Sequence, residues 1–268
     1  MLYKIFVFGW GVFFLFSCST KGKSSNYQPE SLIDLEKIDN TFIISKYYNN
    51  LLDKQLIPED LKNISYHDFS LLTHRFDENK IDPVFIKDSL FYLKSNNQNK
   101  VIPQSFLKMR SEKGPKPDEL FGFEFRINSI IKKDTIAKLN NIAFSELYMV
   151  ENENENFVLI MATKSISEND TNKELLDNLI NYLKTKYGNP DIFKSKFTNH
   201  DFYDWNFNNT LIRLMPSVTI HGEYKDGVEY SERFINIDYV IFNKKYIPTL
   251  KSMDYSRFSW HEFDFSNY

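Results

Sequence analysis

The amino-acid sequence predicts an α+β fold in which a helical N-terminal region is followed by an antiparallel sheet with one long helix packed on a face. Three observations lead to this prediction. In the first third of the 268-residue chain, apolar residues recur every three or four positions, which is the period of a helix. From about residue 120 onward they alternate with polar residues, as in strands that have one buried face. A later segment, Thr171–Tyr187, returns to the helical period.

Residues 31–112 are expected to be mainly helical. Apolar residues at helical spacing predict a first helix over residues 31–56, which Pro58 would end. A second helical stretch is expected over residues 58–76 and a third over Val84–Leu93. On this reading the sheet contributes nothing to the first third of the chain.

A boundary is expected at residues 112–118, where glycine, proline and charged residues give the composition of a linker. The sheet domain would then span residues 118–248. Its first strand is predicted at 120–127, where Phe and Ile alternate with other residues, and the Glu-Asn repeat at 151–156 is expected to form the charged tip of a hairpin. Further strands are predicted at 142–150, 157–163, 202–207, 211–215, 218–224 and 234–242.

The helix Thr171–Tyr187 has clear signals at both ends. Thr171 and Glu174 have the spacing of a capping box, and Gly188 and Pro190 would stop the helix. Its leucines recur on one stripe, which predicts a single buried face. Because the loops between the strands are short, the strands are expected to pair as antiparallel neighbours, with this helix laid across the sheet.

The N-terminus has the pattern of an export signal. Lys4 precedes the apolar run Ile5–Phe16, which is 12 residues long, whereas a membrane-spanning helix needs about 20. The run ends in Leu15-Phe16-Ser17-Cys18, which resembles the lipobox of bacterial lipoproteins. This resemblance implies that residues 1–17 are a cleaved lipoprotein signal peptide and that Cys18, the single cysteine of the chain, is lipidated. An ordinary signal peptide with a coincidental cysteine, or a short uncleaved anchor, are the alternatives.

Residues 18–30 are expected to be a flexible tether, because they are mostly small and polar. By resemblance to lipoprotein sorting signals, Ser19 implies an acylated protein of the outer membrane, on the periplasmic leaflet. A second resemblance is carried by Tyr187-Gly188-Asn189-Pro190 together with Tyr203-Asp204-Trp205-Asn206. These residues are similar to a pattern in uncharacterised envelope lipoproteins of Bacteroidota, which implies the same location.

No sequence motif specifies a catalytic site, a metal site or a cofactor. His67 and His74 are seven residues apart, which separates them by about 10 Å on a helix, too far for one metal ion. His200, Asp201 and Asp204 form a local acid/base cluster that is expected to be only a loop. A pair of catalytic carboxylates can form without a sequence signature, so a hydrolase stays an open alternative. The formal net charge of −3 disfavours a nucleic-acid partner.

Aromatic residues make up 16% of the chain, and they are dense in the C-terminal tail, residues 249–268. Tyr255, Trp260 and Phe265 are therefore candidates for a binding surface, and the alternative is that the tail covers an open face of the sheet. The leading hypothesis is a lipid-anchored envelope protein that is a non-catalytic binding or interaction module and contacts another envelope protein. A small-ligand or glycan-binding protein is the second hypothesis.

Overall fold

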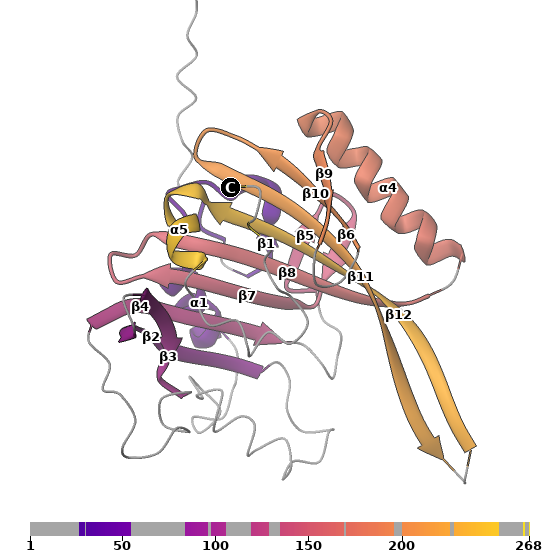
Figure 1. Ribbon diagram of the computed structural model, residues 1–268, viewed down its shortest axis with the longest axis horizontal. Coiled ribbons are helices and arrows are strands. Elements are labelled where there is room, and N and C mark those ends of the chain that lie inside the picture. The colour runs from indigo at the N-terminus through magenta and orange to yellow at the C-terminus, as the bar shows by residue number, and fades with distance from the viewer. Residues whose placement is uncertain are drawn as a thin grey trace, which may run out of the picture.

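The computed structural model describes residues 27–29, 31–54, 84–95, 98–105, 119–128, 135–168, 170–195, 200–225, 228–251, 265 and 268. Its main sheet contains β2 (Val84–Ser95), β3 (Gln98–Pro103), β4 (Glu119–Asn128), β7 (Glu146–Asn152), β8 (Phe157–Ser167), β9 (Asp191–Lys194), β10 (Asp201–Asn206), β11 (Thr210–Lys225) and β12 (Val228–Asn243). The nine strands are ordered β3-β2-β4-β7-β8-β12-β11-β10-β9, and every neighbouring pair is antiparallel (Figure 1). The antiparallel sheet predicted from the sequence is confirmed.

The remaining described elements are short, apart from one helix. A three-stranded sheet contains β1 (Ile33–Asp34), β5 (Ala137–Leu139) and β6 (Ile142–Phe144). The helices are η1 (Leu35–Lys37), α1 (Ile44–Lys54), α4 (Asp170–Tyr187), η3 (Lys244–Tyr246) and α5 (Ile247–Leu250). Strands therefore dominate the described chain.

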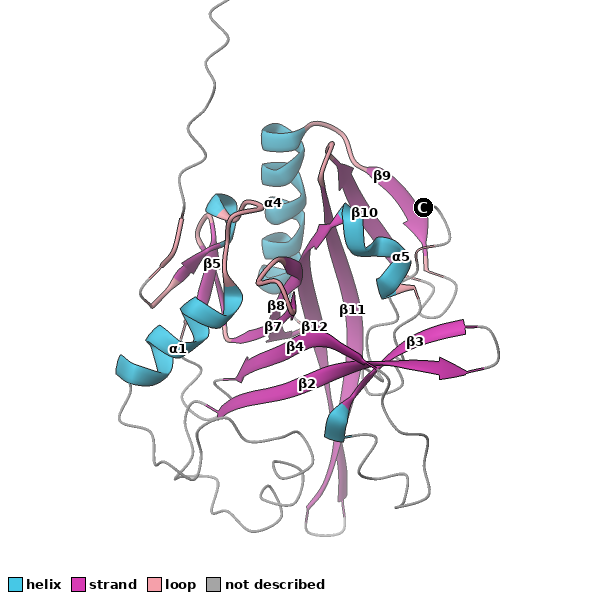
Figure 2. Cartoon of the chain, turned by 90° about the vertical axis from the view of Figure 1, so that its left-hand side faces the viewer, coloured by secondary structure: helices cyan, strands magenta, loops and turns pink. Residues whose placement is uncertain are grey.

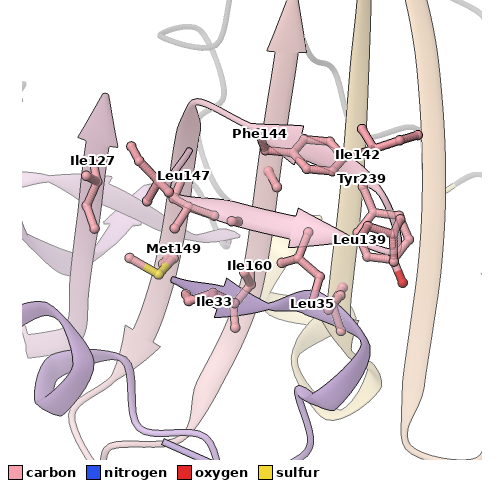
Figure 3. Close-up of a cluster of buried hydrophobic side chains, with 14 of the residues drawn as sticks. Ile33, Leu35, Ile127, Leu139, Ile142, Phe144, Leu147, Met149, Ile160 and Tyr239 are labelled. Atoms are coloured by element: carbon pink, nitrogen blue, oxygen red, sulfur yellow. The ribbon is translucent and has the colours of Figure 1, made fainter. Parts of the chain in front are cut away.

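The larger core lies on the face of the main sheet that α1, α4 and the small sheet cover (Figure 2). Side chains of β12 alternate between faces, and Ile237, Tyr239 and Ile241 point into this core. Leu179 and Leu183 bring α4 onto the same cluster. Residues of the small sheet pack against β7, β8 and β12, as Figure 3 shows for Ile33, Leu139, Phe144, Met149, Ile160 and Tyr239.

The helix α4 ends as its sequence predicts. Gly188 follows the last helical residue with a φ of 87°, and its N–H donates to the carbonyl of Lys184 at 2.9 Å. The indole of Trp205 donates to the Gly188 carbonyl at 2.8 Å. The C-terminal end of α4 is therefore fixed to β10.

The opposite face of the sheet carries a second cluster. Leu211, Val240 and Phe242 point to this side, because they alternate with the residues that enter the larger core. Leu250 of α5 and Phe265 of the C-terminal tail complete the cluster. The tail is thus joined to the sheet at the point where β10, β11 and β12 run side by side.

The expectation of a mainly helical region over 31–112 is wrong. Val84–Leu93 lies in strand β2, and β3 also falls in this region, while α1 covers only the end of the first predicted helix. Phe85 and Ile86 are both buried, so β2 has apolar residues on both faces, and its register with β4 shifts between Leu90 and Phe91. A strand that is buried on both faces loses the two-residue alternation, which explains the error. The predicted helix at 58–76 lies outside the described residues.

The predicted separation at residues 112–118 also has no counterpart in the sheet. Residues 106–118 lie outside the described chain, but β2, which precedes them, pairs with β4, which follows them. The tether predicted over 18–30 ends earlier than expected. Gln28 exchanges two hydrogen bonds with the main chain of Ile43, at 2.8 and 3.3 Å, so the chain contacts the body from Tyr27 onward.

Candidate functional site

A buried ion pair joins β10 to β11. Arg213 lies opposite Asp204 in the strand register. Its Nε donates to Oδ1 of Asp204 at 2.7 Å and its Nη2 donates to Oδ2 at 2.8 Å, and both side chains are fully buried. Neither side chain of this pair is exposed to solvent, whereas the pairs Lys37–Asp34, Lys138–Asp34, Lys186–Glu36 and Arg233–Glu168 all have exposed members. The bidentate geometry makes it both strong and directional.

Aromatic rings surround the guanidinium. The Cζ atom of Arg213 lies 4.9 to 5.9 Å from the ring centroids of Phe193, Phe202, Phe242, Phe265 and Tyr268. Rings at this distance stabilise a cation through their quadrupoles, and the effect is largest where water is excluded. We call Arg213, Asp204 and these rings the aromatic box. Three of its rings come from the sheet and two from the C-terminal tail.

Tyr268 contributes the second polar contact to Asp204. Its hydroxyl donates to Oδ2 of Asp204 at 2.7 Å, and burial together with this hydrogen bond raises the pKa of Tyr268. The N–H of Tyr268 donates to the carbonyl of Phe265 at 3.0 Å. Lys251 Nζ also donates to the main-chain carbonyl of Tyr268. Tyr268 is therefore held by contacts of its hydroxyl, its ring and its main chain.

The contacts of the aromatic box are those of a buried structural cluster. Asp204 accepts three hydrogen bonds, two from the guanidinium of Arg213 and one from the hydroxyl of Tyr268. Neither group is placed to act as a nucleophile or to shuttle a proton. The pair is fully buried, and the rings of Phe265 and Tyr268 already lie against it, so the arrangement joins β10, β11 and the C-terminal tail.

The structure places one of the three predicted surface aromatics. Phe265 is 4% exposed and packs edge-on against Phe242 at a centroid distance of 5.2 Å, so it belongs to the core and not to a binding surface. The alternative prediction, that the tail covers a face of the sheet, is correct for Phe265. Tyr255, Trp260 and the predicted lipidation site Cys18 lie outside the described residues.

Sequence reasoning assigned Asp204 to a loop cluster with His200 and Asp201 and missed Arg213 altogether. Asp204 is instead buried in β10, whereas Asp201 is exposed. One signal was present in the sequence. Arg213 is the single charged residue in the run Leu211–Met215, and a charge within an apolar strand requires a buried partner.

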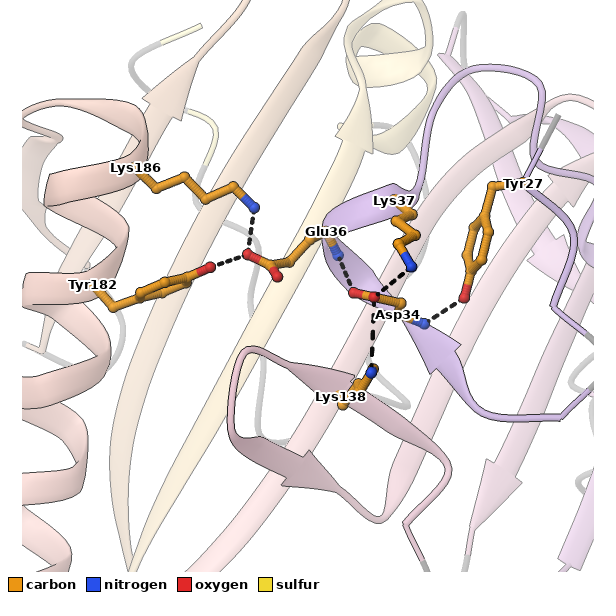
Figure 4. Close-up of polar contacts among 7 residues, drawn as sticks. All are labelled: Tyr27, Asp34, Glu36, Lys37, Lys138, Tyr182 and Lys186. Carbon is orange, nitrogen blue, oxygen red and sulfur yellow. Dashed lines mark hydrogen bonds and ion pairs between the residues drawn. The ribbon is translucent and has the colours of Figure 1, made fainter. Parts of the chain in front are cut away.

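A second polar cluster ties the N-terminal segment to α4 (Figure 4). Glu36 of η1 accepts from the hydroxyl of Tyr182 and from Lys186, both on α4. Burial acts to raise the pKa of Glu36, but these two hydrogen bonds outweigh it and the pKa is lowered. Beside it, Asp34 pairs with Lys37 at 3.2 Å and with Lys138 at 3.9 Å. These contacts fasten the segment to the body and suggest no reaction.

The hairpin of β11 and β12 continues beyond its neighbours. The last pairs with flanking strands are Tyr203 with Leu214 and Ser167 with Phe234. Beyond them, Ile220–Lys225 and Val228–Arg233 pair only with each other among the described strands, and we call these two segments the arm. Six residues of strand correspond to about 20 Å. Figure 1 shows the arm extending past the sheet at the lower right, and Figure 2 shows it at the bottom.

The described residues contain no cluster of His, Cys, Asp and Glu that could hold a metal ion. No helix in the described part of the chain is long and apolar enough to cross a membrane. Comparison of the chain with family models, with curated proteins and with solved structures finds no match. The site therefore has to be interpreted from its own geometry.

Proposed function

We propose that this chain is a lipid-anchored protein of the cell envelope that acts as a non-catalytic interaction module. The lipid would be carried by Cys18, in the outer membrane and on the periplasmic leaflet, and the partner would be another envelope protein. Support for the anchor comes from the lipobox-like residues Leu15–Cys18 and the short polar segment after them. The observation that carries the interaction is the arm.

The arm has the properties of a strand-pairing element. At its base the Arg233 carbonyl accepts from the Glu168 N–H at 2.7 Å, and beyond this contact no described strand pairs with its two outer edges. A two-stranded ribbon is at best marginally stable in water, and a third strand supplies the missing hydrogen bonds. Ile220 is 66% exposed, which gives an incoming strand an apolar contact. We therefore commit to an extended segment of a partner protein as the occupant.

Lipidation is tested by comparing the full-length protein with the Cys18→Ala variant in a bacterial host that lipidates exported proteins. The wild-type protein is expected in the membrane fraction, with an intact mass that includes the acyl chains. The variant is expected to lose both the added mass and the membrane association. An unmodified wild-type mass would contradict the anchor.

Interaction through the arm is tested with a photo-crosslinking amino acid at Ile220, in the lipidated protein and in its native envelope. The matched control is the same amino acid at Ile192 on edge strand β9, which is 54% exposed. We expect one defined crosslinked protein from position 220 and none of that mass from position 192. The crosslink should disappear when the arm is shortened by four residues on each strand. Equal, diffuse crosslinking from both positions would refute the role of the arm.

A further inference from the structure

We infer that the partner of the arm is an amphipathic strand that pairs with the outer edge of β11, with its apolar side chains on the side of the sheet where α4 lies. This assignment rests on the proposed function and adds to it the edge, the face and the residue pattern of the partner. The edge follows from the directions of main-chain groups, and the pattern follows from the side chains of β11 near the base of the arm.

One hydrogen bond fixes the direction of the main-chain groups in the arm. The carbonyl of Arg233 accepts from the N–H of Glu168, so the main chain of Arg233 faces β8. Ile220 lies opposite Arg233 in the register of β11 and β12. Hydrogen-bonded and non-hydrogen-bonded pairs alternate along an antiparallel ladder, so the N–H and C=O of Ile220 point away from β12. The same alternation turns the main chain of Val218 and Gly222 outward.

The unpaired edge of β11 is longer than that of β12. On β11 the last pair with β10 is at Leu214, and outward groups lie at every second residue from Pro216 to Tyr224. In the described part of β12 beyond its contact with β8, outward groups lie only at Ser231 and Glu229. Proline has no N–H to donate, and an edge is where a strand tolerates it. A partner strand can therefore form more hydrogen bonds on β11 than on β12.

The side chains of β11 beside this edge are apolar on one face. Ile212 and Leu214 enter the larger core, so by alternation Val218 and Ile220 lie on the side of the sheet where α4 lies. Val218 lies opposite Ile235, which is buried in the same core, and Ile220 is exposed. This side therefore offers apolar contacts to every second residue of an added strand.

The opposite face is polar at the same place. Ser217 and Thr219 alternate with Val218 and so lie on the face of the second cluster. The hydroxyl of Thr219 accepts from the amide of Asn236 at 3.1 Å, and the carbonyl oxygen of that amide accepts from Ser165 at 2.6 Å. Partner residues on this side would meet hydroxyl and amide groups and are expected to be polar. The partner strand should therefore alternate apolar and polar residues along the edge.

The test places a photo-crosslinking amino acid at Val218, Thr219, Ile220 or Ser231 of the full-length lipidated protein in its native envelope. Mass spectrometry then locates the captured residue in the partner. Positions 218 and 220 should capture two apolar residues separated by one position, and position 219 should capture the polar residue between them. Ser231 is the matched control on the outer edge of β12, and it should give no crosslink of this mass.

Two proline variants test the main-chain contact, with the crosslinker kept at Ile220. Val218→Pro removes an outward N–H of β11 and no hydrogen bond of the hairpin, and Pro216 already lies on the same edge. The crosslink should fall about tenfold, the effect of losing one hydrogen bond. Ser231→Pro removes an outward N–H of β12 and should leave the yield unchanged. Urea midpoints check that both variants fold, and if Val218→Pro does not, the comparison of crosslinker positions 218 and 231 still decides the edge.

Three results would overturn the inference and leave the proposed function intact, because a partner is still captured at the arm. Capture from position 231 and not from position 218 would assign the partner to β12. Captured residues three or four positions apart would show a helix instead of a strand. A crosslink that Val218→Pro leaves unchanged would show that the partner does not bond to the main chain of β11. Absence of any crosslink from Ile220 would overturn the proposed function and the inference together.

Discussion

Replacing Arg213 with Met is expected to destabilise the protein by about 3–5 kcal/mol, because it leaves the Asp204 carboxylate buried without its cation. The structure supports a value in this range. Both side chains are fully buried, and the two hydrogen bonds are 2.7 and 2.8 Å long. At an effective dielectric constant of about 20, two unit charges about 4 Å apart attract each other by about 4 kcal/mol.

The chain offers a matched control at the base of the arm. Arg233 forms an ion pair with Glu168 at 2.6 Å, but the Arg233 side chain is 60% exposed. Exposed pairs contribute only about 0–1 kcal/mol, since water and salt screen them. Arg233→Met should therefore have a small effect, and the difference between the two Arg→Met variants measures the consequence of burial.

A third variant separates the loss of the pair from the cost of an unpaired charge. Replacing both members with apolar residues, Arg213→Met with Asp204→Val, removes the unpaired buried carboxylate. The double variant should recover at least half of the stability that Arg213→Met loses. The assay is urea unfolding followed by circular dichroism and tryptophan fluorescence, with the unfolding slope checked for each variant. An Arg213→Met effect below about 1 kcal/mol, equal to that of Arg233→Met, would show that water reaches the pair and would refute the reasoning.

Three other contacts give further predictions. The lowered pKa of Glu36 means that its contribution is present above the ordinary carboxylate pKa and is lost as pH falls through the lowered value. Glu36→Gln, which also weakens the contact with Lys186, should cost about 1 kcal/mol at neutral pH and make the urea midpoint less dependent on pH between 3 and 6. Burial raises the pKa of Glu151, so its contribution is present at low pH and is lost as pH rises through the raised value. Glu151→Gln should reduce that loss in a urea series from pH 4 to 8, whereas Glu151→Ala removes the acceptor of the Ser45 N–H, at 3.0 Å, and should cost about 1 kcal/mol. Gly122→Ala should cost about 3 kcal/mol by the same assay, because the new Cβ would lie 2.0 Å from the Glu151 carbonyl oxygen.

Each of these predictions has an outcome that contradicts it. A Glu36→Gln midpoint that keeps the wild-type slope against pH would show that its carboxylate is not coupled to Lys186. If Glu151→Gln and Glu151→Ala lose the same stability, the acceptor at the start of α1 is unimportant. A Gly122→Ala protein with wild-type stability would mean that β4 and β7 separate easily.

Local signals in the sequence predicted the structure best where a short segment decides the outcome. The helix predicted at Thr171–Tyr187 agrees with α4 to within one residue, and Gly188 ends it as expected. The predicted hairpin is confirmed in β7 and β8, but the strand predicted at 142–150 is divided between β6 of the small sheet and β7, and Glu151 and Asn152 of the predicted tip are buried in β7. The prediction of a helix at Val84–Leu93 failed because the apolar residues of strand β2 are buried on both faces of the sheet. That burial depends on parts of the chain that are distant in sequence.

Pro216 illustrates a different limit. The sequence suggested two strands on either side of it, but β11 runs through it without interruption. The pairing with β10 stops at Leu214, so Pro216 lies where β11 has become an edge and no N–H is needed. The aromatic box could not be predicted from the sequence either, because its tail residues contact Arg213 only in the folded sheet.

The unbroken hairpin of β11 and β12 also bears on the order in which the chain folds. Its ladder has sixteen pairs, from Lys225 and Val228 at the tip of the arm to Thr210 and Asn243 at the other end of the two strands. The pairs at the tip of the arm join residues close in sequence and can form within microseconds, whereas the pairing of β12 with β8 joins residues far apart in sequence. The arm is therefore expected to act as a template during folding: a slip of one residue at its tip would turn Arg213 to the opposite face. Correct pairing at the tip of the arm therefore sets the alignment of the two strands on which the rest of the sheet is assembled.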